Sequence, residues 1–162
     1  MSQSLKTVAL LSVSAAATTV LIQACGGDAR AQAAPDPIEG VWDVAVTQRD
    51  CSSGAAQSTF RSNQVFHHGG TFADTSTHPP STRGPAWGAW TGGGTAGAYT
   101  VNFRFIRYNA DGSLAGTAVS TLTVTLAADG KSFSATRASK LLDTAGNQVG
   151  ALCTADAGSR AF

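Results

Sequence analysis

The sequence predicts an all-β fold, with a single antiparallel up-and-down barrel of about eight strands as the preferred architecture and a β-sandwich as the alternative. Apolar and polar residues alternate in most segments after residue 37, which is the period of a strand with one buried face. Turn signals, above all glycine runs and Asp-Gly pairs, recur every ~10 to 15 residues. No segment shows a convincing helical period, so we expect sequential strands joined by short turns.

Four strands are expected in the first half of the chain after residue 37. Two of them flank Gly69-Gly70, which predicts a bulge or tight turn and hence a short hairpin. Residues 78–85 contain three prolines and are expected to form a loop, because proline cannot donate a hydrogen bond inside a central strand. The expected strands are, in order, 38–47, 58–68, 71–76 and 86–91.

The second half has a cleaner pattern. The strand that begins at Tyr99 alternates between apolar and polar residues and ends at Asp111-Gly112, a strong hairpin signal. Asp129-Gly130 and residues 143–147 supply the next two turns. The strands that follow are 114–126, 132–142 and 148–162.

The first 24 residues predict a secretory signal peptide. Lys6 supplies a positive charge, and residues 8–22 form an apolar segment of about 15 residues, the length of a signal sequence and too short for a membrane span. We therefore expect a signal peptide over 1–24, a flexible tether over 25–37 that ends in two prolines, and a β-barrel domain over 38–162.

Residues 21–27, Leu-Ile-Gln-Ala-Cys-Gly-Gly, resemble the bacterial lipobox. The resemblance implies that Cys25 carries a diacylglycerol, becomes the N-terminus after cleavage and anchors the protein in a membrane of the cell envelope. Gly26, rather than aspartate, follows the cysteine, and by the same resemblance this favours the outer membrane. The alternative is ordinary cleavage after Ala31 or Ala33, which would give a soluble periplasmic or secreted protein.

Cys51 and Cys153 remain as a pair once Cys25 is assigned to lipid. In an oxidising compartment a disulfide between them is the expected state, with two free thiols as the alternative. Closing a loop of about 100 residues stabilises a fold by up to ~4.7 kcal/mol in the chain-entropy model. The bond would bring the first and last strands together.

Gly40-Val41-Trp42, together with Arg160 near the C-terminus, resembles the lipocalin and wider calycin pattern. The resemblance implies an eight-stranded barrel whose bottom is closed by the arginine lying against the tryptophan, a cation–π contact of about 0.5 to 2 kcal/mol. Partner residues in an antiparallel pair have a nearly constant sum of residue numbers. The sums for the two cysteines and for Trp42 with Arg160 differ by two, so both pairs demand nearly the same register. This agreement favours the closed barrel.

The chain also resembles, overall, small secreted bacterial proteins that share this Gly-x-Trp start and a C-terminal cysteine strand. That resemblance implies a fold and no activity.

Composition argues against several classes of function. The chain has 11 basic and 10 acidic residues, so it lacks the basic excess that nucleic-acid binding requires. Its glycine runs do not match a phosphate-binding loop, and it has no nucleophile elbow, so we expect no cofactor and find no positive support for catalysis. Most basic residues are arginine, which suits planar and stacked contacts, and some are expected to be structural clamps.

Histidines and aspartates are the remaining candidates for chemistry. Adjacent residues on a strand point to opposite faces, so only one of His67 and His68 could join His78 at a metal site, and we expect surface histidines and no bound metal. The candidate acids, none of which has a spacing that pairs it with another, are Asp43, Asp50 and Asp74.

The densest aromatic stretch is a candidate ligand cavity. In a barrel its side chains could line a pocket for an apolar molecule, as in lipocalins, or they could fill the core, because an eight-stranded barrel is just wide enough to be filled. Arg104 and Arg107 on the same strand are expected to face solvent, with contact to an acidic head group as the alternative. The candidate cavity residues are Trp87, Trp90, Tyr99, Phe103 and Phe105.

Three hypotheses follow. The first is a lipid-anchored, non-enzymatic barrel that binds a small apolar or amphipathic molecule, and an open cavity above roughly 300 Å³ would favour it. The second is a structural or protein-interaction lipoprotein, which a solid interior would favour. The third and least favoured is a barrel-type cyclase or isomerase with Asp43 or His67 inside the barrel, which a buried charged residue facing a cavity would favour.

Overall fold

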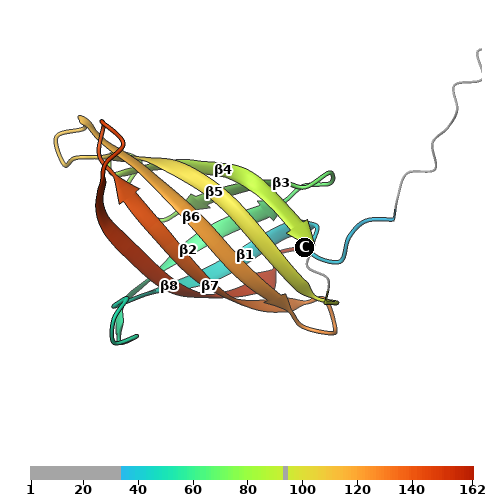
Figure 1. The fold of residues 1–162 in the computed structure, drawn as a ribbon. Helices are drawn as coiled ribbons and strands as arrows, with labels where there is room; N and C mark the ends of the chain where they lie inside the picture. Colours follow the sequence, from blue (N-terminus) through green and yellow to red (C-terminus); the bar gives the residue numbers. More distant parts are fainter. Residues whose placement is uncertain (1–33, 93–94) are drawn as a thin grey trace, which may run out of the picture. The chain divides into compact units, whose positions relative to one another are not determined.

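The computed structural model describes residues 34–92 and 95–162, and these residues form a closed antiparallel barrel of eight strands (Figure 1). Each strand pairs with its neighbours in sequence, and β1 pairs with β8, so the predicted up-and-down barrel is confirmed. The expected signal peptide and the tether up to residue 33 lie outside the described residues. The strands are β1 (Gly40–Arg49), β2 (Ala56–Phe66), β3 (Thr71–Ser76), β4 (Arg83–Gly92), β5 (Ala98–Tyr108), β6 (Leu114–Leu126), β7 (Ser132–Leu142) and β8 (Gln148–Arg160).

Residues 34–162 are one compact unit with its own core and a continuous ladder of strand pairs. Closure of the ladder leaves no free edge, and a unit with these features can fold without the rest of its chain. Among the residues that the structure describes, no helix has the length and apolar character needed to cross a membrane.

The predicted loop over 78–85 is too long, because β4 begins at Arg83 and contains Pro85. The register of β4 on β5 shifts between Arg83 and Ala86, which is the signature of a bulge. A residue in a bulge needs no ladder hydrogen bond, so proline is tolerated there although it would break a regular central strand.

The first and last strands lie side by side in the register that the sequence predicts. Trp42 faces Arg160 across the β1–β8 ladder, and the pairing continues to Arg49 opposite Cys153. Cys51 lies just beyond β1, in the turn to β2, and its sulfur is bonded to that of Cys153 with the two Cα atoms 5.2 Å apart. The predicted disulfide therefore ties this turn to β8.

Aromatic side chains fill one half of the barrel interior. Phe66 lies with its ring centroid 5.1 Å from that of Phe72, and Trp42 lies 5.0 Å from Phe133, both pairs edge to face. Gly158 on β8 makes room for this packing, since a Cβ there would lie 2.3 Å from the Phe133 ring. This half of the barrel is a solid core.

The chain ends close the same half. Ile38 lies fully buried before β1, and the indole Nε1 of Trp42 donates to its carbonyl oxygen at 2.9 Å. The Arg160 guanidinium lies 4.4 Å from the Trp42 ring centroid and donates to three backbone carbonyls, of Pro37, Glu39 and Gly130. Gly40 is required beneath it, because its φ is +131° and a Cβ would lie 2.7 Å from Arg160 Nη1. We call this half the closed end.

The opposite end carries the turns β1–β2, β3–β4, β5–β6 and β7–β8, as the alternating direction of the strands requires (Figure 1). We call it the open end. Its interior differs from that of the closed end, because buried charged side chains lie there beside aromatic ones.

Candidate ligand site at the open end of the barrel

A cavity of about 260 Å³ opens at this end, and we call it the mouth cavity. Its walls are mostly apolar, with the side chains of Phe60, Leu141 and Leu152, while three arginines contribute guanidinium groups. The lining residues are Gln48, Phe60, His78, Thr82, Arg83, Phe105, Arg107, Arg137, Leu141 and Leu152. An apolar wall with a few convergent polar groups is typical of small-molecule sites.

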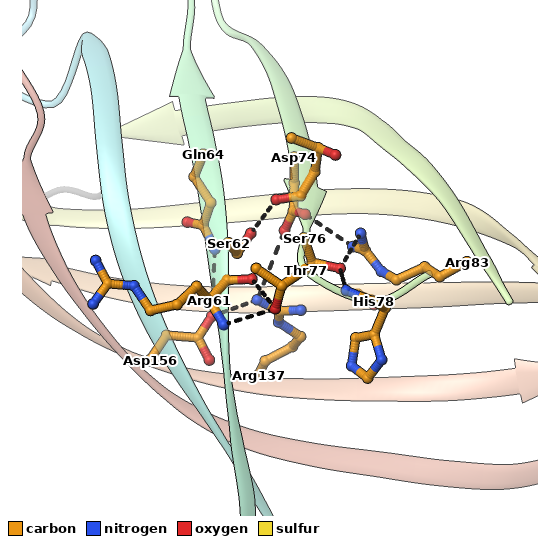
Figure 2. A network of polar contacts seen from close by, with 12 residues as sticks. Arg61, Ser62, Gln64, Asp74, Ser76, Thr77, His78, Arg83, Arg137 and Asp156 are labelled. Carbon is orange, nitrogen blue, oxygen red and sulfur yellow. Dashed lines mark hydrogen bonds and ion pairs between the residues drawn. The ribbon is translucent and has the colours of Figure 1, made fainter. Parts of the chain in front are cut away.

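Two of the three arginines are paired with buried aspartates (Figure 2). Arg83 Nη2 donates to Asp74 Oδ1 at 2.9 Å, and Arg137 Nη2 donates to Asp156 Oδ2. Arg137 also lies 4.0 Å from the second oxygen of Asp74, which joins the two pairs into one network. All four side chains are at least nine-tenths buried, so the pairs are shielded from solvent.

Neutral polar groups hold the Asp156 carboxylate and the Arg83 guanidinium in position. The Thr154 hydroxyl donates to Asp156 Oδ1 at 2.5 Å, and Gln64 Nε2 approaches the other oxygen at 3.4 Å. Arg83 uses a second nitrogen to donate to the Ser76 hydroxyl at 3.2 Å. A buried charge persists only when it is paired and hydrogen-bonded, and this network meets that condition for Arg83 and Asp156.

Aromatic rings support the same two guanidinium groups. Arg83 lies 4.2 Å from the ring centroid of Phe105, and Arg137 lies 5.1 Å from that of Phe103. Both contacts are within the range of a cation–π interaction. These two arginines are therefore fixed by a carboxylate on one side and by an aromatic ring on the other.

Arg107 differs from the other two arginines of the mouth cavity. It faces Arg83 across the β4–β5 ladder. Its Nη1, like Nε of Arg137, is buried without a hydrogen-bond partner among the described residues, but Arg107 also lacks a carboxylate partner there. None of the ion pairs formed by the described residues includes Arg107. Since two aspartates offset the formal charges of two arginines, Arg107 leaves the cavity with a net positive charge.

His78 adds no second positive charge to the cavity near neutral pH. Its ring centroid lies 4.4 Å from that of Phe60 on the cavity wall. Burial, and secondarily the positive charge of Arg83, lowers the pKa of His78 below its ordinary value of 6.5. The imidazole is therefore neutral at pH 7 and serves as part of the wall.

Aspartates on the turns of the open end are occupied within their own turns. Asp50 accepts hydrogen bonds from the Ser53 backbone and side chain, Asp111 from Ser113, and Asp143 from Asn147. These bonds favour the charged carboxylate and lower the pKa of each aspartate. The three groups shape the rim and form no ion pair with Arg107.

The five aromatic residues considered as a cavity lining do not share one cavity. Trp87 is 58% exposed on the outer wall of the barrel, because it has the opposite strand parity to the buried Trp90. Trp90, Tyr99 and Phe103 are buried in the core, where they pack against other aromatic rings. Phe105 alone among the five lines the mouth cavity.

The other candidate residues are spread over the barrel. Asp43 accepts a hydrogen bond from Asn63 at the surface and His67 is exposed, so neither lies inside the barrel as the cyclase hypothesis requires. His68 contacts Glu39 near the closed end, whereas His78 lies at the open end. No group of three potential ligands that could hold a metal ion occurs within the described ranges.

Sequence reasoning missed the buried ion-pair network. Asp74 shares the parity of Phe72 on β3, and Gln64 shares that of Phe66 on β2, so strand alternation places both inside. The signal was therefore present in the alternation of these two strands. Arg104 is exposed on the outer wall as expected, but the expectation that Arg107 faces solvent is wrong, because Arg107 has the opposite strand parity and lines the mouth cavity.

Comparison with known families and with curated proteins finds no family model that matches this sequence and no curated protein that matches it.

Proposed function

We propose that this protein is exported, is anchored to the cell envelope by a lipid on Cys25, and binds a small apolar or amphipathic molecule in the mouth cavity. The observation that carries the proposal is the cavity itself, an apolar hollow lined by three arginines in a barrel whose closed end has a filled aromatic core. Its volume of about 260 Å³ is just below that of a typical drug-sized site, so the ligand is small or extends into solvent.

Two features support the location. The lipobox-like segment at residues 21–27 lies upstream of a proline-containing tether, the arrangement of an anchored domain held away from a membrane. The Cys51–Cys153 disulfide is typical of proteins that fold in an oxidising compartment outside the cytosol. The location is tested by labelling cells with a radioactive fatty acid, which we expect to mark the native chain and not Cys25→Ala.

Binding is tested with N-phenyl-1-naphthylamine, a neutral apolar dye that fluoresces when it leaves water. We expect the barrel unit, residues 34–162, to increase the fluorescence of the dye in a saturable manner. Leu152→Trp should fill the cavity and weaken dye binding by about tenfold, since one lost or blocked apolar contact of this kind changes affinity by roughly 1 to 3 kcal/mol.

The matched control is Val149→Trp, on the same strand but 60% exposed and outside the cavity lining. It should bind the dye as the native barrel does. If dye binding is absent, or if both tryptophan variants weaken it equally, the mouth cavity is not the binding site. Native mass spectrometry of the protein purified from its own host then shows whether any small molecule accompanies it.

A structural or protein-interaction role is the second candidate, and a specific surface favours it. Trp87, Ile106 and Val119 are exposed on the outer wall over β4, β5 and β6. Exposed apolar side chains that gather on one face often mark a protein contact. This role gains support if no ligand co-purifies and the dye does not bind.

A further inference from the structure

The mouth cavity has more positive than negative side chains around it, with three arginines and two aspartates. Arg83 and Arg137 each have a carboxylate partner, whereas Arg107 has none among the described residues. The turn aspartates at the rim could have supplied one, but their oxygens are engaged in their own turns. The cavity thus presents a single cation that the protein itself does not neutralise.

A buried donor without a partner is destabilising, because it has lost its hydrogen bonds to water and gained none. Arg107 Nη1 is in this state, as is Arg137 Nε. Arg137 has Asp156 as a carboxylate partner, whereas none of the described residues forms an ion pair with Arg107. The other two arginines each have a counter-charge from another strand, Asp74 on β3 and Asp156 on β8. An anion placed beside Arg107 would remove the penalty and would be held by a charge-assisted hydrogen bond.

The surroundings of Arg107 limit the kind of anion. The net charge of the arginines and aspartates around the cavity is one positive unit, which one negative charge offsets and two would exceed. Phe60, Leu141 and Leu152 offer apolar walls to the remainder of the molecule. The site therefore combines one point of charge recognition with an apolar enclosure.

We infer that the ligand of the mouth cavity is an amphiphilic monoanion, such as a medium-chain carboxylate, whose head group pairs with Arg107 while its apolar part packs against Phe60 and Leu152. This inference rests on the proposed function, because it names the chemical class of the ligand for the same cavity. Arg83 and Arg137 are already paired with Asp74 and Asp156 and lie against aromatic rings, so Arg107 is the arginine of the cavity that pairs with the head group.

The experiment compares octanoate with 1-octanol, which have the same chain length and differ in charge. Each is used to displace N-phenyl-1-naphthylamine from residues 34–162 at neutral pH. We expect octanoate to displace the dye at a concentration about tenfold lower than 1-octanol, the effect of one charge-assisted hydrogen bond. Added salt should reduce this preference, because screening weakens the pairing of charges.

Arg107→Gln should abolish the preference for octanoate, measured as the ratio of the 1-octanol and octanoate concentrations that displace half of the dye from the same variant. Arg107→Lys, which keeps the charge, should retain part of the preference and serves if the glutamine variant is unstable. Arg104→Gln is the matched control, on the same strand but exposed on the outer wall, and should behave as the native barrel does.

The outcomes separate this inference from the proposed function. If both molecules displace the dye equally from the native barrel, or if Arg107→Gln keeps the preference, the anion inference is overturned and the cavity still binds apolar ligands. If the dye binds and neither molecule displaces it, a medium-chain monoanion is not the ligand. If the dye itself does not bind, the proposed function fails and the inference fails with it.

Discussion

The two ends of this barrel use arginine in opposite ways. At the closed end Arg160 lies over Trp42 and donates to three backbone carbonyls, so its guanidinium is fully committed to the fold. At the open end Arg107 lies in a cavity and leaves Nη1 without a partner among the described residues. Arginine is thus fully hydrogen-bonded to the fold at one end, whereas at the other end it keeps a donor without a partner among the described residues.

The side chains inside the two ends also differ in how much they stabilise the fold. The closed end is filled by interlocking aromatic rings, which stabilise through buried apolar area and edge-to-face contacts. The open end contains buried ion pairs, which contribute little net stability because desolvation offsets their attraction. A region that is charged, hollow and poorly suited to stabilising the fold is where a binding function is expected. The following predictions test this division.

The largest effect is expected from Trp42→Ala at the closed end. Trp42 is fully buried, and its removal should lower the free energy of unfolding by about 3 to 5 kcal/mol, the usual cost of truncating a large aromatic residue in a core. Urea denaturation followed by circular dichroism measures it. Trp87→Ala, at an exposed tryptophan, should change stability by less than about 0.5 kcal/mol. Similar losses in the two variants would contradict the assignment of the closed end as the stabilising core.

Replacing one partner of the Arg137–Asp156 pair should destabilise the barrel more than replacing both partners. Asp156→Leu leaves Arg137 buried without its main partner and should lower the free energy of unfolding by about 3 kcal/mol. Combining it with Arg137→Met removes both charges and should restore most of that loss. Urea denaturation of the two single variants and the double variant gives the coupling energy. A double variant as unstable as Asp156→Leu would mean that the pair itself stabilises the barrel.

Sequence alone predicted the closed end far better than the open end. The Gly-x-Trp segment and Arg160 fixed the register of β1 on β8, because one slip would turn every side chain of a strand to the other face. At the open end the disulfide was predicted, but the ion-pair network was missed because Asp74 and Arg137 are four strands apart in the order of the barrel, and no local pattern shows that they meet. Their shared inward parity was visible, whereas their pairing depends on the closed geometry. Pro85 was assigned to a loop because the bulge that accommodates it depends on how β4 pairs with β5, and the residues around Pro85 do not reveal that pairing.

Tyr99 offers a smaller, pH-dependent test of the closed end. Burial, and then its hydrogen bond to Asp36 at 2.5 Å, raises the pKa of Tyr99 from 10.0 to about 12. Folding favours the neutral phenol, so this contribution to stability is complete below pH 10 and is lost as the pH rises from 10 to 12. Ultraviolet absorbance titration should show one late phenol ionisation that is missing in Tyr99→Phe. A native chain that titrates like the variant would contradict a sealed closed end.

The smallest expected effect has the opposite sign and concerns Arg107. Arg107→Met replaces an unpartnered buried donor by an apolar group of similar length, so the free energy of unfolding should rise by about 1 kcal/mol without ligand. Thermal unfolding measures it, with Arg104→Met on the exposed face expected to change nothing. Octanoate should then raise the melting temperature of the native barrel more than that of Arg107→Met, because only the native barrel has an unpaired cation to satisfy. If Arg107→Met is less stable than the native barrel, Arg107 supports the fold as Arg160 does, and the two ends are not divided between stability and binding.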